Sequence, residues 1–139
     1  MTAKEYFNTI AVYRDSIERL MKHLDYLREG ATAIGGFDYS KPQVQSAPKN
    51  VTEDKIIKIA DAALKVSDLM AKYSGMILEA EERLAQLSRY EYSKIISYRF
   101  LDTKRHSMGW IAEQLGYDEV YTRRLYGEAL DEFEEKFLK

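Results

Sequence analysis

Two long runs of apolar residues in heptad spacing constrain the fold of this chain more than any other feature. In both runs the apolar residues recur in alternating steps of four and three, which is typical of a helix that packs along one seam against another helix. The first run consists of Tyr6, Ile10, Tyr13, Ile17, Leu20, Leu24 and Leu27. The second run consists of Ile59, Ala63, Val66, Met70, Tyr73, Ile77, Ala80, Leu84 and Leu87. The spacing predicts helices over about residues 3–29 and 52–87, joined by a loop over residues 30–51 into a long antiparallel hairpin.

Local signals support these bounds. Thr2 and Glu5 have the spacing of a capping box, in which a hydroxyl side chain and a Glu three residues later satisfy free backbone amides at a helix start. We expect Gly30 to end the first helix, since glycine is frequent just after a helix end. Pro42 and Pro48 in the segment that follows exclude regular structure there.

A second, weaker apolar stripe on the second predicted helix has no partner within a two-helix hairpin. It consists of Ile57, Ala60, Leu64, Ala71 and Leu78. Either the C-terminal part of the chain packs on this stripe, or two copies of the chain associate into a helical bundle. A third alternative is that a stripe this weak simply remains exposed at the surface. We expect the second arrangement, a homodimer.

Residues 89–139 have the pattern of a separate three-helix module. Its first helix is predicted over Glu91–Thr103. A short apolar helix then leads to Gly116, which takes a left-handed conformation without a Cβ penalty, and Asp118 follows as the N-cap of the last helix. Two short helices joined by a turn that contains Gly are typical of a helix-turn-helix. The sequence thus predicts an all-α protein, with an oligomerising helical hairpin over residues 1–88 and a helix-turn-helix module over residues 89–139.

The last predicted helix has one apolar and one charged face. Leu125, Ala129 and Leu130 lie on the inner face, and Glu119, Tyr121, Arg123 and Arg124 lie on the outer face. Arginine side chains on such a helix can donate to guanine O6 and N7 in a DNA major groove. The alternative is a pair of helices that packs within its own protein and touches no DNA.

Composition excludes several classes of function. The 139 residues include no cysteine, which removes disulfides, thiolate nucleophiles and thiolate metal sites together. The two histidines, His23 and His106, belong to no metal-binding motif, and no converging set of catalytic groups can be assembled. We therefore expect no enzymatic activity, no metal and no cofactor. No apolar run is long enough to span a membrane, and the N-terminus lacks the pattern of a signal peptide, so we expect a cytoplasmic protein.

The net charge limits how the chain can bind nucleic acid. At −2 it argues against strong sequence-independent affinity for DNA, which depends on Lys and Arg neutralising phosphates. Acidic residues such as Glu128 and Asp131 directly follow the arginines. Any contact with DNA is therefore expected to use a small face, with modest affinity per chain and binding as an oligomer.

At this point the residues show a family likeness. The segment WIAEQLGYDEVYTRRLYGEAL, residues 110–130, resembles region 4 of sigma factors, which reads the −35 promoter element. Over nearly its whole length the chain is similar to small phage and prophage proteins related to the ArpU-type late-gene transcription regulators. The matching features, in order, are the long hairpin, Val44-Gln45-Ser46, Tyr98–Lys104 and Trp110–Leu130.

The resemblance implies a DNA-binding role and assigns residues to it. The sigma positions that contact bases correspond to Glu119, Val120, Arg123 and Arg124. Glu119 and Val120 differ from the Arg-Glu pair usual in sigma factors, so an ordinary −35 hexamer is not the expected target. We further expect Tyr121 and Thr122 at the groove wall. The residues expected at phosphates are Arg99, Lys104, Arg105 and His106.

The resulting hypothesis is a phage or prophage transcription regulator in a bacterial host cell. It binds double-stranded DNA as a homodimer, with RNA polymerase as a further partner. Two alternatives remain at this point. One is an adaptor that uses the helix-turn-helix to bind RNA polymerase or another phage protein. The other is a small terminase-type packaging subunit, which would form a ring of many copies.

Overall fold

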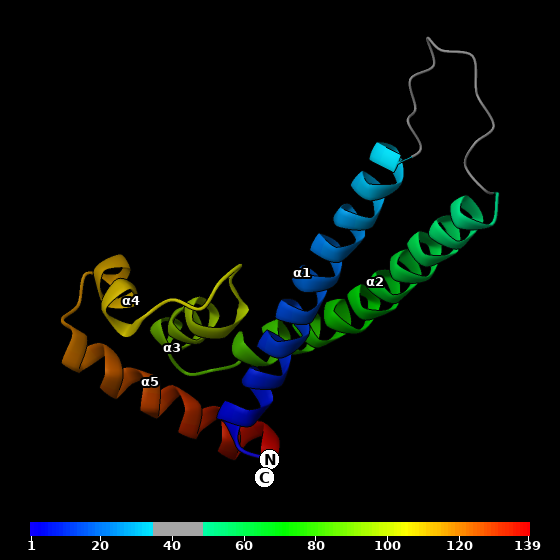
Figure 1. Cartoon of the computed structure of the whole chain (residues 1–139). Helices are drawn as coiled ribbons and strands as arrows, with labels where there is room; N and C mark the ends of the chain where they lie inside the picture. The colour runs from blue at the N-terminus through cyan, green and yellow to red at the C-terminus, as the bar shows by residue number, and fades with distance from the viewer. Residues whose placement is uncertain (35–48) are drawn as a thin grey trace. The chain divides into compact units, whose positions relative to one another are not determined.

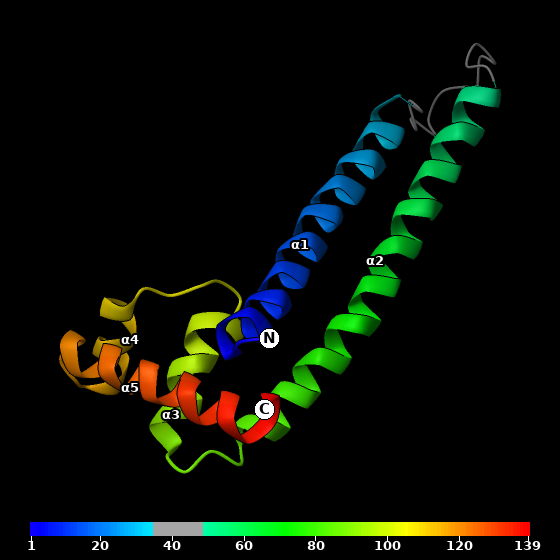
Figure 2. The same ribbon diagram turned by 90° about the horizontal axis from the view of Figure 1, so that it is seen from below.

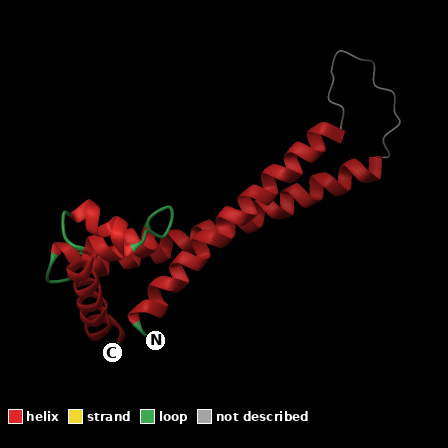
Figure 3. Ribbon diagram, turned by 60° about the vertical axis from the view of Figure 1, so that its left-hand side comes forward, coloured by secondary structure: helices red, strands yellow, loops and turns green. Residues whose placement is uncertain are grey.

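The computed structural model describes residues 1–34 and 49–139, with side chains described for residues 1–30 and 53–139. All regular structure in these residues is helical (Figure 3). The helices are α1 (Ala3–Ile34), α2 (Lys49–Leu84), α3 (Tyr90–Ile96), α4 (Met108–Leu115) and α5 (Glu119–Phe133), as labelled in Figure 1. Two π-helical segments, Ser97–Leu101 and Glu134–Leu138, continue α3 and α5. The predicted all-α class is confirmed.

The start of α1 is the predicted capping box, but its predicted end is wrong. The Glu5 backbone N–H donates to Thr2 Oγ1 at 3.1 Å, and the Thr2 N–H donates to Glu5 Oε2 at 2.8 Å. The helix continues past Gly30 to Ile34, since a glycine inside a helix costs only about 1 kcal/mol. The expected loop residues 35–48, with Val44-Gln45-Ser46, lie outside the described residues.

The chain forms two compact units, each of which is described by itself. The head unit consists of residues 1–14 and 72–139, and the helix-pair unit lies within residues 15–71. Each of the two long helices therefore contributes one end to each unit. The predicted boundary between residues 88 and 89 falls inside the head unit. The reason is that the N-terminal end of α1 and the C-terminal end of α2 share a core with the C-terminal helices.

In the helix-pair unit the predicted seams are the covered faces of the two helices. Of the predicted seam residues, Ile17 and Leu24 of α1 and Val66 of α2 are buried, and Ile59 and Ala63 are half-buried. Ala62 is buried as well, although it was not on the predicted seam. Met70 departs from this pattern, since 47% of its surface is exposed although it was expected on the seam. The second stripe of α2 faces solvent in the single chain.

The core of the head unit is built around three buried phenylalanines from distant parts of the chain. The ring centroid of Phe7 lies 4.5 Å from that of Phe133 and 5.6 Å from that of Phe100. None of the three is more than 2% exposed. The Ala3 N–H donates to Glu134 Oε1 at 2.9 Å, which joins the first turn of α1 to the end of the chain. The two termini accordingly lie close together, and α3 lies against α5 (Figure 2).

The turn between α4 and α5 follows the sequence signals closely. Gly116 ends α4 with φ at +74°, in the left-handed region, as predicted. Asp118 is the N-cap of α5, and its Oδ1 accepts from the Tyr121 N–H at 2.7 Å. Leu125, Ala129 and Phe133 on the inner face of α5 are fully buried. This packing fixes which residues of α5 remain outside.

Candidate nucleic-acid interface

The four residues that we expect from the sequence to contact bases lie on the exposed face of α5. Val120 is 79% exposed, and the side chains of Arg123 and Arg124 are 62% and 73% exposed. Glu119 lies in the first turn, with 51% of its side chain exposed. Because the opposite face of α5 is held in the core, these four side chains project from a fixed support. Within the head unit the surface is open to a large ligand.

Both arginines of this face are already paired with carboxylates. Arg123 Nη2 lies 2.8 Å from Glu119 Oε1, and Arg124 Nε lies 3.2 Å from Glu128 Oε1. Each pair joins residues four apart on α5. Exposed pairs of this kind contribute little in water, so a phosphate or a base edge can replace the carboxylate at small cost. The two arginines and the two glutamates that pair with them, Glu119 and Glu128, carry no net charge together.

Glu128 is the more firmly held of the two carboxylates. Tyr92 Oη donates to its Oε2 at 2.9 Å, in addition to the contact with Arg124. The hydrogen bond from Tyr92, and next that from Arg124, lower the pKa of Glu128. Glu128 therefore stays ionised at neutral pH and keeps Arg124 on the outer side of the helix.

Of the two residues expected at a groove wall, Thr122 is buried and Tyr121 is partly exposed. Thr122 is fully buried, and its hydroxyl donates to the Asp118 carbonyl at 2.9 Å, so its assignment to a groove wall is wrong. Tyr121 is half-buried, with its ring edge-on to that of Tyr117 at 5.2 Å between centroids. Its hydroxyl accepts from Arg89 Nη2 at 3.5 Å.

His106 is a structural residue rather than a phosphate ligand. It is only 8% exposed, its ring stacks on that of Trp110 at 3.6 Å between centroids, and its Nε2 lies 2.7 Å from Asp102 Oδ2. Its expected contact with DNA is therefore wrong. Arg99, half-buried, donates from Nη1 to the His106 carbonyl at 2.9 Å and so holds the segment before α4. This bond takes up one donor of Arg99, which had been expected at phosphates.

Lys104 and Arg105 are exposed in the loop before α4, as a phosphate-contacting role requires. This loop is tied to the first half of α1. Arg14 Nη1 donates to the Phe100 carbonyl at 3.1 Å and also to the Asp102 carbonyl, and Arg105 donates to Asn8 Oδ1. The loop is thus fixed relative to the head-unit core.

Arg89 is a basic residue near this surface that the sequence reasoning missed. It precedes α3, its side chain is 40% exposed, and it lies 3.5 Å from Glu91 Oε2 as well as from the Tyr121 hydroxyl. In the sequence it stands in an apparent break between helices, and no motif marks it. Only the packing of α3 against α5 brings it beside Tyr121.

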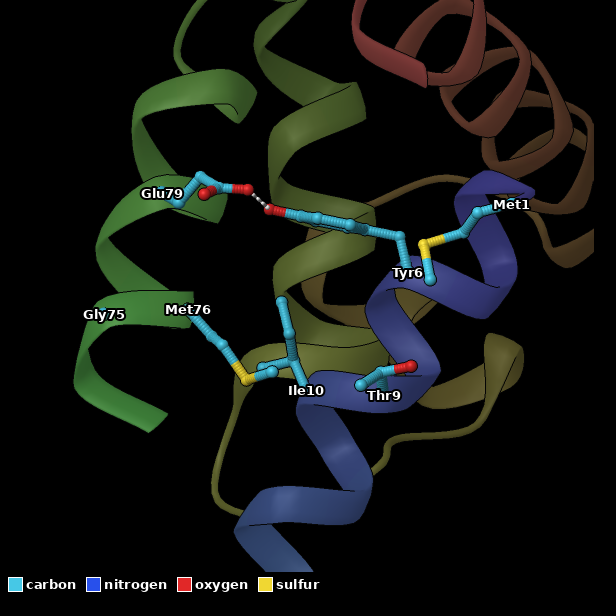
Figure 4. A pocket seen from close by; sticks show the side chains of 7 residues that line it. All are labelled: Met1, Tyr6, Thr9, Ile10, Gly75, Met76 and Glu79. Atoms are coloured by element: carbon cyan, nitrogen blue, oxygen red, sulfur yellow. Dashed lines mark hydrogen bonds between the residues drawn. The ribbon is translucent and has the colours of Figure 1, made fainter. Parts of the chain in front are cut away.

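The head unit also contains a hollow that residues of α1 and α2 line. The hollow, of about 550 Å³, lies between α1 and α2 within the head unit, lined by Met1, Tyr6, Ile10, Met76 and Glu79 among others (Figure 4). Tyr6 Oη donates to Glu79 Oε1 at 2.9 Å, and burial, together with this bond, raises the pKa of Tyr6 to about 12. The two polar groups thus satisfy each other.

No three side chains of His, Asp or Glu in the described residues converge as metal ligands would. Over residues 1–34 and 49–139 no helix combines the length and apolar character needed to cross a bilayer.

The comparisons with known proteins assign no family. The sequence matches no protein-family model and no curated protein, and the structure matches no solved structure.

Proposed function

We propose that this chain is a DNA-binding transcription regulator of a phage or prophage. In this proposal α4 and α5 form a helix-turn-helix, α5 enters the major groove, and α1 and α2 form a long hairpin that assembles two copies. The observation that carries the proposal is the exposed face of Glu119, Val120, Arg123 and Arg124 on a helix whose opposite face is fully buried. The left-handed turn at Gly116 supports it, since it joins two short helices as a helix-turn-helix requires.

The chemistry of the face suits duplex DNA. Arg123 and Arg124 leave their glutamates and donate to guanine O6 and N7, and Val120 contacts the methyl group of thymine. Lys104 and Arg105 contact phosphates and set the orientation of the head unit. Because both arginines are paired with glutamates before binding, sequence-independent affinity is low and the guanine contacts provide a large share of the binding energy.

The test begins with selection of a preferred duplex from a random library, followed by titration of that duplex and of random duplex. Arg124→Ala is expected to weaken binding to the preferred duplex by about 5- to 150-fold, with little effect on random duplex. Arg19→Ala, an exposed arginine in the helix-pair unit, is the matched control and leaves both affinities unchanged. Equal losses on both duplexes would show that Arg124 reads no base. Absence of saturable duplex binding at low salt would refute DNA binding altogether.

A second candidate is an adaptor that binds a protein through the same face. The pairing of both arginines with glutamates and the 79% exposure of Val120 favour it, because together they make a neutral surface with an apolar centre. Such an adaptor would retain RNA polymerase from a bacterial extract. Val120→Glu would abolish retention, whereas Arg124→Ala would have a smaller effect. Retention that survives Val120→Glu would exclude this face as the contact.

A further inference from the structure

α2 has apolar residues on two opposite faces, and only one of them is covered. The seam that includes Val66 is buried, whereas Ile57 and Leu64 on the other face are 56% and 63% exposed. Ala60 and Ala71 on the same face are also exposed. We call these four residues, with Ser67 between them, the outer stripe. A helix with apolar residues on two sides typically packs between two neighbouring helices. The described residues supply one such neighbour, α1.

The outer stripe belongs to a strict seven-residue repeat in the sequence. Residues 54–60, 61–67 and 68–74 read DKIIKIA, DAALKVS and DLMAKYS. Each heptad has Asp first, an apolar outer-stripe residue fourth, Lys fifth and a small residue seventh. A small residue every seven positions, next to a larger one, lets two helix backbones approach closely along the whole repeat.

The charges of the repeat point to a copy of the same helix as the partner. Every heptad contributes one Asp and one Lys on the same flank of α2, where Lys58, Asp61 and Lys65 also line a hollow beside α1. The two charges of each heptad cancel, so two copies meet without net repulsion. In an antiparallel pair with its two-fold axis near residue 62, Ile57 lies opposite Ser67 of the second copy, and Ala60 lies opposite Leu64 of the second copy. In the same register, each Asp of the repeat is offset from a Lys of the second copy by about 3 Å, measured along the helix axis. Lysine side chains span that offset.

We propose that a second copy of this chain packs antiparallel on the outer stripe of α2. The dimer is expected to form in the absence of DNA. A chain that stays monomeric and a chain that binds no DNA are therefore separate results. The large exposed residues of the stripe are few, so the contact lies at the small end of specific interfaces, and the dimer depends on protein concentration.

The first experiment measures the mass of the full chain by sedimentation over a range of concentrations. The wild type is expected to convert from monomer to dimer, and Leu64→Glu to raise the dissociation constant by about a hundred-fold, since each dimer loses two apolar contacts and gains two buried charges. Ile57→Lys, which adds the opposite charge, is expected to have the same effect. Val12→Glu is the matched control, an apolar residue with 49% exposure on α1, and it leaves the dimer intact.

The second experiment reports the direction of packing. Because the chain has no cysteine, Ala60→Cys and Ala71→Cys each introduce its only thiol. In the antiparallel pair the two copies of position 60 lie near the two-fold axis, whereas those of position 71 are about 27 Å apart along the helix axis. A short bismaleimide is expected to link the first variant and not the second. A chain that stays monomeric, a dimer unaffected by Leu64→Glu and Ile57→Lys, or linkage through position 71 would each overturn the proposal.

Discussion

Replacing Phe7 with alanine tests whether the first turns of α1 belong to the same cooperative unit as the C-terminal helices. Phe7 is 0% exposed and contacts the rings of Phe100 and Phe133. Truncating a fully buried phenylalanine costs about 3–5 kcal/mol, because the transfer free energy is lost and a cavity remains. For a unit of this size the midpoint of thermal unfolding is expected to fall by about 12–40 °C.

The assay uses a natural reporter of the head unit. Trp110 is the only tryptophan of the chain, and its ring stacks on His106 in that unit. Urea unfolding followed by tryptophan fluorescence therefore measures the stability of the C-terminal helices, far along the sequence from position 7. Val12→Ala, at an exposed position of α1, is the control and is expected to change stability by less than about 0.5 kcal/mol. A loss below about 1 kcal/mol for Phe7→Ala would refute the shared core.

Three other outcomes follow from particular contacts. Gly116→Ala is expected to cost about 1–2 kcal/mol in urea unfolding, because φ of +74° is strained for any residue with a Cβ, although the added methyl has open space. The pKa of Tyr6 is raised from 10.0 to about 12 by burial and by its bond to Glu79, so the neutral phenol stabilises the head unit fully below pH 10. That contribution is lost as the pH rises from 10 to about 12. The difference in free energy of unfolding between wild type and Tyr6→Phe should therefore shrink over the same interval. A difference that stays constant would contradict the raised pKa of Tyr6. For DNA, removing Lys104 and Arg105 together should lower affinity for all duplexes alike and reduce the slope of log K against log salt by about one unit per lost contact, and an unchanged slope would exclude both as phosphate contacts.

Local signals predicted the start of α1 and the turn between α4 and α5 well, because the physical cause lies within a few residues. Thr2 with Glu5, Gly116 and Asp118 each act through backbone groups one to three positions away, so their roles can be read from the sequence. Gly30 was misread because a glycine only weakens a helix, and neighbouring residues can carry the helix past it.

Contacts between distant segments could not be read in the same way. The heptad pattern selected one seam on α1 that excludes Phe7, and nothing local shows that a second face of this helix packs on α5. Thr122 and His106 looked available because they are polar, but each is satisfied inside the protein, Thr122 by the Asp118 carbonyl and His106 by Asp102. The exposed arginine face was predictable, since it is the complement of an apolar stripe on a single helix.

The bond between the Ala3 amide and Glu134 links the beginning of the chain to its end. Contacts of such long sequence separation form late in folding, because a large loop must close before they stabilise anything. During synthesis the first turns of α1 leave the ribosome long before their partners exist, so Phe7 stays in water until Phe100 and Phe133 have been made. A chain terminated before residue 133 would keep that apolar surface uncovered, which makes truncated products targets for aggregation and proteolysis.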